Sequence, residues 1–302
     1  ILAYIYSPMP LYLAAGDIFW TNSIDFILTA VPLFILMGEI LLRADVAKKM
    51  YAALSHWLSW LPGGLMHSNI TACTMFAATS GSSIATAATV GTVAMPQIKK
   101  DGYNPRLFMG TLAAGGTLGI LIPPSINMIV YALLTDTSVP KLYLAGFLPG
   151  AILAGMFMLT VLVACIIKPT WGGSRQHSDW ATRFRVLPDL LPPLGIFLIV
   201  VGSIYAGVAT PTEAASLGVV ASLGLAAWNG KVSIEMLKQA VEGTMRTTAM
   251  VMLIVFAAVF LNFVLAVVGL TDLLSDFING LGLGPMQTMI VIVIAFMILG
   301  CF

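Results

Sequence analysis

Charged side chains are scarce in this sequence. Of 302 residues, 14 are Lys or Arg and 13 are Asp or Glu, so 9% of the chain is charged while 59% is hydrophobic. Soluble domains carry about 25% charged residues, so this composition excludes an ordinary soluble protein. It favours an all-α membrane protein, with the lipid bilayer as its solvent. The net charge of +1 gives no reason to expect nucleic acid as a partner.

Cysteine and several catalytic motifs are also lacking. Cys73, Cys165 and Cys301 lie far apart in apolar runs, which indicates small core residues and not a disulfide framework or a metal site. The ATPase motif G-x-x-x-x-G-K-[ST] does not occur, so active transport would have to draw on an ion gradient. The chain begins at Ile1 and ends at Phe302 inside apolar stretches, and we therefore expect a fragment of a longer protein.

Uncharged runs of about 20 residues, enough to cross a bilayer, recur along the chain. Four of them qualify by length, at 107–135, 142–167, 190–212 and 247–271. A fifth at 214–230 is somewhat short, and a sixth at 25–42 qualifies if Glu39 lies near an interface. Arg43 follows Glu39 by four residues, which predicts an ion pair at a helix end.

The run 50–98 contains no Asp, Glu, Lys or Arg, yet as one helix it would be about 70 Å long. Its first part, 47–64, is amphipathic and predicts a helix lying in the membrane interface. Two apolar arms of about 13 to 15 residues then flank the sequence SGSS at 80–83. Each arm is roughly 20 Å long, too short to span, so we predict a re-entrant helical hairpin.

The positive-inside rule supports this topology. If the hairpin enters and leaves on the cytoplasmic side, Lys141 is the one basic residue outside the cytoplasmic loops. The cytoplasmic loops then contain Arg43, Lys48, Lys49, Lys99, Lys100, Arg106, Lys168, Arg175, Arg183, Arg185, Lys231, Lys238 and Arg246.

The order of elements repeats near the end of the sequence. An apolar span is followed by an amphipathic stretch at 269–286, a Gly/Pro cluster, and a new apolar arm from residue 287. The predicted topology makes this second copy enter from the opposite side. Inverted repeats whose broken helices meet near the membrane midplane characterise secondary transporters.

The hairpin tip offers candidate ligands. Gly81 permits a sharp turn, and the hydroxyls of Ser80, Ser82 and Ser83 offer oxygen ligands for a hard cation. The beginning of the second arm offers backbone N–H groups to an anion. The alternative is that these serines only cap two short helices.

The next span contains consecutive prolines. Proline has no N–H, so Pro123 and Pro124 free the carbonyls of Gly119 and Ile120. Two polar side chains, Ser125 and Asn127, follow the break. Unwound carbonyls of this kind coordinate sodium in discontinuous helices. The alternative is a proline kink whose carbonyls bond neighbouring hydroxyls.

Two isolated titratable residues have two interpretations each. Glu213 follows Thr210 and Pro211, so it is either a residue near a buried cation or a carboxylate at the beginning of a helix. His67 could act as the base for a tip serine in an intramembrane hydrolase. However, no G-x-S-x-G elbow occurs and no acidic residue lies between 46 and 100, which favours an uncharged, hydrogen-bonded histidine.

The segment 62–132, from PGGLMHSN through SGSS to GGTLGILIPPSINMIVYA, resembles the signature region of the large permease subunit of tripartite ATP-independent periplasmic (TRAP) transporters, the DctM-like proteins. The segments YLAGFLPGAI and GVATPTEAA also match, so the resemblance covers essentially the whole chain. It implies a member of the ion-transporter superfamily with an elevator mechanism in the bacterial inner membrane. It also implies sodium coupling, a small membrane partner subunit, and a periplasmic protein that delivers an organic acid.

The resemblance assigns residues to roles. It implies a sodium site formed, directly or nearby, by Ser80, Gly81, Ser82, Thr86, Gly119, Ile120, Ser125 and Glu213. It implies substrate contacts at Ser82, Ser83, Pro123, Pro124 and Asn127. The second hairpin tip would begin near Gly300. Since no Lys or Arg falls within the predicted membrane core, we expect hairpin dipoles and hydroxyls to hold the substrate's carboxylate.

These expectations divide the chain into five parts. They are scaffold spans with an interfacial arm helix (1–64), a hairpin and broken helix (65–135), and further spans with a cytoplasmic loop at 168–189 (136–212). A second repeat with its arm helix (213–286) and the first arm of a second hairpin (287–302) follow. The expected function is sodium-driven uptake of a C4-dicarboxylate, sialic acid or similar carboxylate. The alternatives are a stand-alone sodium-coupled dicarboxylate or citrate carrier and, more remotely, the serine hydrolase.

Overall fold

The computed structural model describes residues 11–174 and 178–300, and every regular element in those two ranges is helical. Arg175 and Cys301 lie outside the described residues. The α-helices are α2 (Ala15–Ser23), α3 (Ala30–Arg43), α4 (Val46–Leu58), α5 (Leu65–Ser80), α6 (Ser83–Asp101), α7 (Pro105–Thr117), α8 (Ile126–Leu134), α9 (Val139–Ile167), α10 (Trp180–Val186), α11 (Leu191–Tyr205), α12 (Pro211–Trp228), α13 (Ile234–Val267), α14 (Leu270–Gly280) and α15 (Pro285–Leu299). Short 3-10 helices lie between them at η1 (Leu11–Ala14), η2 (Phe26–Thr29), η3 (Leu118–Ile120), η4 (Pro169–Trp171) and η5 (Leu187–Leu190).

Four helical stretches among the described residues are long and apolar enough to cross a membrane: Phe26–Arg43, Val139–Ile167, Trp180–Tyr205 and Ile234–Val267. Their outer faces are apolar. On α9, for example, Leu144, Leu148 and Ile152 are 65%, 70% and 54% exposed and follow one another at helical spacing. A stripe of large exposed apolar side chains is what a lipid-facing surface requires, so the all-α membrane class is supported.

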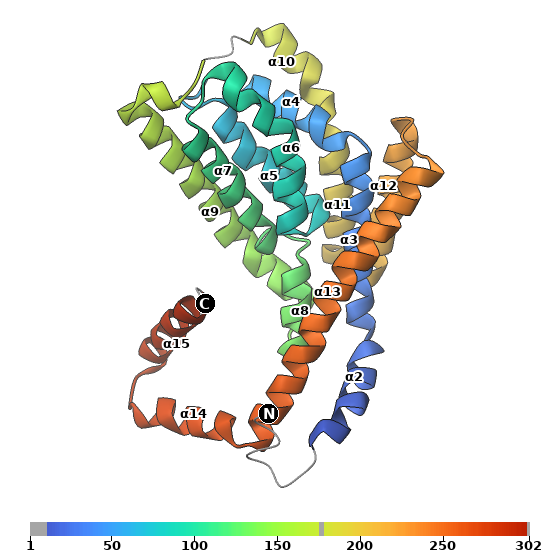
Figure 1. The fold of residues 1–302 in the computed structure, drawn as a ribbon, viewed down its shortest axis with the longest axis vertical. Helices are drawn as coiled ribbons and strands as arrows, with labels where there is room; N and C mark the ends of the chain where they lie inside the picture. The colour runs from blue at the N-terminus through green and yellow to red at the C-terminus, as the bar shows by residue number, and fades with distance from the viewer. Residues whose placement is uncertain (1–10, 175–177, 301–302) are drawn as a thin grey trace. The chain divides into compact units, whose positions relative to one another are not determined.

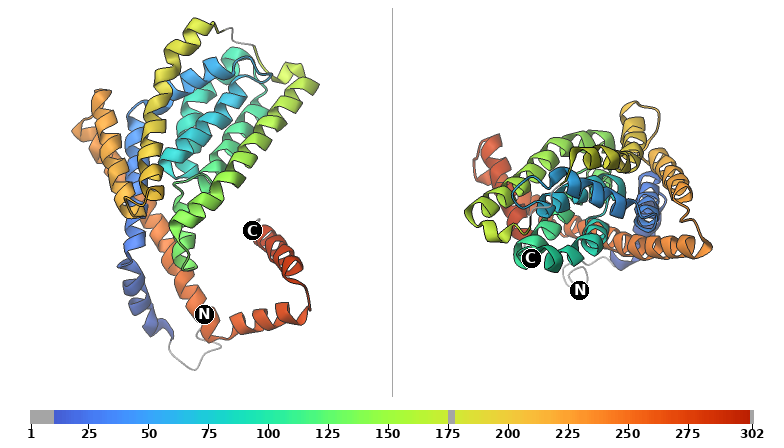
Figure 2. Two further views of the ribbon diagram at one scale, coloured as in Figure 1. Left: turned by 180° about the vertical axis from the view of Figure 1, so that it is seen from behind. Right: turned by 90° about the horizontal axis from the view of Figure 1, so that it is seen from above.

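Helix contacts divide the chain into two compact units, one of residues 25–251 and one that combines the two ends. In the unit 25–251, α3 packs along α12 and α12 along α11. The hairpin helices α5 and α6 pack against each other and against α7, and α9 lies along α5 and α7 (Figures 1 and 2). Helix α4 contacts α3, α5 and α6, so it joins the two groups of helices.

The predicted hairpin is present as two helices around a break. Helix α5 ends at Ser80 and α6 begins at Ser83, as the sequence indicated. The second arm is longer than predicted, because α6 runs through Pro96 to Asp101. Pro96 lies on the exposed side of the helix, where its missing N–H leaves no buried carbonyl unpaired. At 19 residues, α6 is about 28 Å long, so its length alone no longer argues against a span, and the re-entrant path stays a prediction.

The predicted span 107–135 is interrupted as its prolines indicated. Helix α7 passes into η3, the chain leaves helical geometry over the two prolines, and α8 begins at Ile126. Asn104 begins α7 by accepting hydrogen bonds from the backbone N–H groups of Arg106 and Leu107, at 3.1 Å each. The break therefore follows from proline chemistry in an otherwise apolar and well-capped segment.

The other unit contains α2, the end of α13, and the helices α14 and α15. Phe19 of α2 contacts Phe256 and Phe260 of α13, with ring centroids 5.7 and 6.2 Å apart. Along the sequence, a long helix, an amphipathic helix, a Gly/Pro turn and an apolar helix follow one another in 234–299, as they do in 26–80. The repeated order of elements is therefore confirmed, and the opposite orientation of the second copy stays a prediction.

Candidate functional site

The hairpin tip is a tight turn between α5 and α6. Gly81 ends α5 in the left-handed conformation with φ of 63°, where residues with a side chain are strained. Ser82 is extended, and its Oγ accepts a hydrogen bond of 3.3 Å from the N–H of Ala85. The capping role considered for Ser82 is therefore present.

Two hydroxyls meet beneath this turn. The Oγ of Ser80 and the Oγ1 of Thr86 are 3.0 Å apart, and both residues are buried. Ser80 is the last residue of α5 and Thr86 lies in the first turn of α6, so the turn itself brings them together. The pair presents two oxygen atoms in a buried environment, which is the ligand type that a hard cation prefers.

The tip is docked onto the break in the neighbouring helix. The carbonyl of Gly81 accepts a hydrogen bond of 3.3 Å from the N–H of Ile126, the first residue of α8. A Cβ atom on Gly81 would lie 2.7 Å from the carbonyl oxygen of Pro124, and one on Gly119 would lie 3.0 Å from the backbone nitrogen of Ser83. These approaches leave no room for a side chain, so glycine at both positions allows the tip and the break to form one site.

The carbonyls freed by the prolines are partly used within the chain. The buried hydroxyl of Ser125 donates a hydrogen bond of 2.7 Å to the carbonyl oxygen of Ile120. The alternative interpretation, in which a neighbouring hydroxyl bonds a freed carbonyl, therefore holds for Ile120, one of the two carbonyls. The oxygen of Ser125 keeps lone pairs that can still face a cation, since the hydroxyl donates only its hydrogen.

Two predicted site residues, Asn127 and Glu213, are exposed, unlike the buried residues at the tip and the break. Asn127 is in the first turn of α8 but exposed. Glu213 is exposed and forms a capping box, in which its carboxylate accepts hydrogen bonds of 2.8 Å from the N–H and the hydroxyl of Thr210. The hydroxyl of the adjacent Thr212 donates a hydrogen bond of 3.1 Å to the carbonyl oxygen of Phe26. Phe26 lies twelve residues, or roughly 18 Å of helix, before Gly38, the residue of α3 that approaches Ser80 at the tip.

His67 does not lie near the tip serines. It is near the beginning of α5, whereas Ser80 is 13 residues later at the end, about 20 Å away along the helix. Its Nε2 is 2.9 Å from the carbonyl oxygen of Pro62 and the residue is buried. Histidine and serine therefore cannot act together in this arrangement as a base and a nucleophile.

Sequence reasoning missed a cavity beside the tip. A cavity of about 410 Å³ is lined by α3, by both hairpin helices including Ser80 and Ser82, and by Arg246 of α13. The sequence pattern places Arg246 in a loop, because the predicted span begins at residue 247. Helix α13 begins thirteen residues earlier, where the Oγ of Ser233 accepts a hydrogen bond of 3.0 Å from the N–H of Met236. A serine cap of this kind is a helix-start signal that the sequence offered.

Comparison with known proteins gives a consistent result. The family model described as "Tripartite ATP-independent periplasmic transporter, DctM component" matches residues 1–302. The C4-dicarboxylate TRAP transporter large permease protein DctM of Pseudomonas aeruginosa is 33% identical over 302 residues, which is 99% of this chain and 69% of that protein. The ectoine/5-hydroxyectoine TRAP transporter large permease protein UehC of Ruegeria pomeroyi is 31% identical over 275 residues, which is 91% of this chain and 64% of that protein.

A third relative is larger. The isethionate TRAP transporter permease protein DctMQ of Oleidesulfovibrio alaskensis is 27% identical over 288 residues, which is 95% of this chain and 45% of that protein. The matched regions of these three relatives thus amount to between 45% and 69% of their lengths.

Proposed function

The chain belongs to the family of tripartite ATP-independent periplasmic transporters, DctM component, and on that premise we propose that the whole protein takes up an organic acid across the bacterial inner membrane by coupling to a sodium gradient. The observation that carries the proposal is the docking of the hairpin tip onto a broken helix. Discontinuous helices that meet in this way form the ion and substrate sites of secondary transporters.

The donor atoms at the tip support sodium as the coupling ion. Ser80 and Thr86 contribute hydroxyl oxygens, and the break contributes the carbonyl of Gly119 and the hydroxyl of Ser125. These are neutral oxygen ligands, which suit a hard cation of single charge. The site needs no carboxylate, so the position of Glu213 in a capping box is compatible with it.

The relatives suggest the class of substrate. Their names specify C4-dicarboxylate, ectoine or 5-hydroxyectoine, and isethionate. We infer a small organic acid for this protein. The beginning of α6, with free backbone N–H groups next to Ser82 and Ser83, offers a site for its acidic group.

The proposed mechanism has three steps. Sodium binds the hydroxyls and carbonyls at the tip and break, which fixes the geometry of the adjacent substrate site. A periplasmic binding protein delivers the acid, and the hairpin domain moves as one body relative to the remaining spans. The sodium gradient drives the cycle. Each net elementary charge that moves into the cell adds about 2.3 kcal/mol of driving free energy per 100 mV of membrane potential. A small membrane subunit completes the transporter, as the tripartite family implies.

The test is uptake into proteoliposomes that contain the full-length permease and its small membrane partner. Labelled succinate, ectoine and isethionate are offered with the purified binding protein and an inward sodium gradient each present or absent. Uptake of at least one acid that requires both additions is expected. A potassium gradient of equal size serves as the control for osmotic and electrical effects.

The other outcomes have distinct meanings. Sodium-driven uptake without the binding protein would point to a stand-alone carrier and contradict the tripartite proposal. Absence of uptake for all three acids would contradict the transport proposal itself. Covalent labelling of Ser80, Ser82 or Ser83 by a serine-reactive probe would revive the hydrolase alternative, which the separation of His67 from the tip disfavours.

A further inference from the structure

The cavity beside the hairpin tip has the size and composition of a ligand site. Its volume of about 410 Å³ lies within the range of small-molecule pockets. Its lining combines the hydroxyl-bearing residues Ser80 and Ser82 and the charged Glu39 with apolar side chains such as those of Ile35, Leu42 and Met250. A site that combines a few polar groups with apolar side chains fits a small molecule with one strongly polar group and a carbon skeleton.

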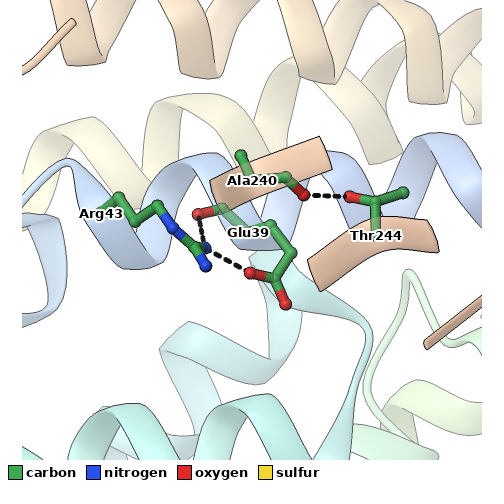
Figure 3. A network of polar contacts seen from close by, with 4 residues as sticks. All are labelled: Glu39, Arg43, Ala240 and Thr244. Carbon is green, nitrogen blue, oxygen red and sulfur yellow. Dashed lines mark hydrogen bonds and ion pairs between the residues drawn. The ribbon is translucent and has the colours of Figure 1, made fainter. Parts of the chain in front are cut away.

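Close packing between α3 and α13 brings a basic residue to this cavity. A Cβ atom on Gly243 would lie 2.6 Å from the carboxyl carbon of Glu39, so the absence of a side chain there lets α13 pass directly over Glu39. Figure 3 shows Glu39 and Arg43 of α3 beside the segment of α13 that contains Ala240 and Thr244. Arg246 follows Gly243 by three residues, about one helical turn, and lines the cavity.

The charges around the cavity leave one cation without a partner. Glu39 forms an ion pair with Arg43, which also donates a hydrogen bond of 2.9 Å to the carbonyl of Glu39. No ion pair involves Arg246 among residues 11–174 and 178–300. The charged residues that line the cavity are Glu39 and Arg246, and the ion pair with Arg43 already balances the charge of Glu39. A free guanidinium at the edge of a largely apolar cavity attracts an anion.

We propose that Arg246 binds the acidic group of the transported molecule, a carboxylate or sulfonate, in the cavity between α3, the hairpin tip and α13. This inference rests on the proposed function and identifies a residue that recognises the substrate. The guanidinium donates paired N–H bonds to two oxygens of the acid, the hydroxyl of Ser82 donates a further bond, and the apolar walls contact the carbon skeleton. Ser80 remains with the sodium site.

This proposal differs from an expectation drawn from the sequence, which no observation tests. The sequence predicts that hairpin dipoles and hydroxyls hold the acid, because no basic residue falls within the predicted membrane core. The earlier beginning of α13 places Arg246 twelve residues inside a helix, about 18 Å from its first residue.

The experiment compares Arg246→Gln with Lys238→Gln in the full-length permease with its partner subunit and binding protein. Lys238 is a matched control, since it is an exposed cation two turns earlier on α13 and does not line the cavity. The probe is whichever of succinate, ectoine or isethionate the wild type takes up fastest. Loss of one charge-assisted interaction should raise the KM of Arg246→Gln roughly 10- to 100-fold. The control should change less than 2-fold.

A charge-rescue measurement separates a binding role from a folding role. Arg246→Cys is purified and then treated with a methanethiosulfonate reagent that attaches either an ammonium or a sulfonate group. The ammonium should lower the KM at least 5-fold and the sulfonate should not. Cys73 and Cys165 are buried, and treated wild type gives the correction for any background labelling, including that at Cys301.

Failure of this inference differs from failure of the proposed function. If the wild type transports and Arg246→Gln keeps its KM, only the role of Arg246 is overturned. Equal KM increases in Arg246→Gln and Lys238→Gln, or equal effects of the two reagents, would also overturn it. If the wild type itself takes up none of the acids, the proposed function fails first.

Discussion

Ser80 and Glu213 are both predicted to take part in the sodium site, and their surroundings differ sharply. The hydroxyl of Ser80 is buried and shares a hydrogen bond with Thr86 in the turn between two helices. The carboxylate of Glu213 is exposed and accepts hydrogen bonds from the N–H and the hydroxyl of Thr210. Burial and packing therefore separate two residues that the sequence pattern treated alike.

This contrast gives a paired prediction. Ser80→Ala should raise the sodium concentration for half-maximal uptake roughly tenfold, because one buried oxygen ligand is lost. Glu213→Gln should leave it within about twofold, since glutamine also forms a capping box. Sodium titration of uptake measures both values. Ser203→Ala on α11, whose hydroxyl bonds only its own helix at Val200, is the matched control. If Glu213→Gln raised the sodium concentration for half-maximal uptake as much as Ser80→Ala does, Glu213 would have to be part of the ion site.

The residues of the tip were predictable because their chemistry is local. Glycine and serines between two apolar arms indicated the turn, and consecutive prolines indicated the break. Arg246 and Gly243 were not predictable in this way. Their role depends on how closely α13 approaches Glu39, and residues more than 200 positions apart in the chain make that contact.

At the scale of elements, the hairpin and the broken helix behave as one packed unit. Gly81 and Gly119 lie where the backbones of the tip and the break approach each other, so this packing requires residues without side chains there. Helix boundaries were harder to predict than helix existence. α6 passes through Pro96, and α13 begins at Ile234 and not near residue 247, because exposure of the proline and a serine cap decide those ends.

Gly81→Ala tests this packing. Alanine would be strained at a φ of 63° and its Cβ would lie 2.7 Å from the oxygen of Pro124. The expected cost is at least about 2 kcal/mol, which corresponds to a fall in Tm of roughly 4 °C or more. Thermal unfolding of the purified protein in detergent measures it. Gly110→Ala, which meets no atom within 4 Å, should leave the Tm unchanged or raise it slightly. A similar loss in both variants would contradict the packing argument.

At the scale of the whole molecule, the distribution of basic residues predicts the orientation in the membrane. Lys141, near the beginning of α9, is the basic residue predicted to lie on the periplasmic side, while Arg106 and Arg183 are predicted to lie in the cytoplasm. The apolar outer faces of the long helices agree with a membrane protein. They do not distinguish its two sides, which the charge pattern alone predicts.

Cysteine labelling tests the orientation. Lys141→Cys should react with a membrane-impermeant maleimide in cells whose inner membrane is intact. Arg106→Cys and Arg183→Cys should react only after permeabilisation. Labelling of the unsubstituted protein, in which Cys73 and Cys165 are buried, supplies the background. The reverse pattern would invert the proposed topology and place the hairpin entrance on the periplasmic side.

The hydrogen bond from the N–H of Ile126 to the carbonyl of Gly81 has one further consequence. It joins the hairpin tip to the first residue of α8. Deuterium exchange at that single amide therefore reports how often the tip leaves the break. Sodium, if it binds both elements, slows that exchange in proportion to its occupancy. The exchange rate of the Ile126 amide thus measures ion binding without a transport assay and without an attached label.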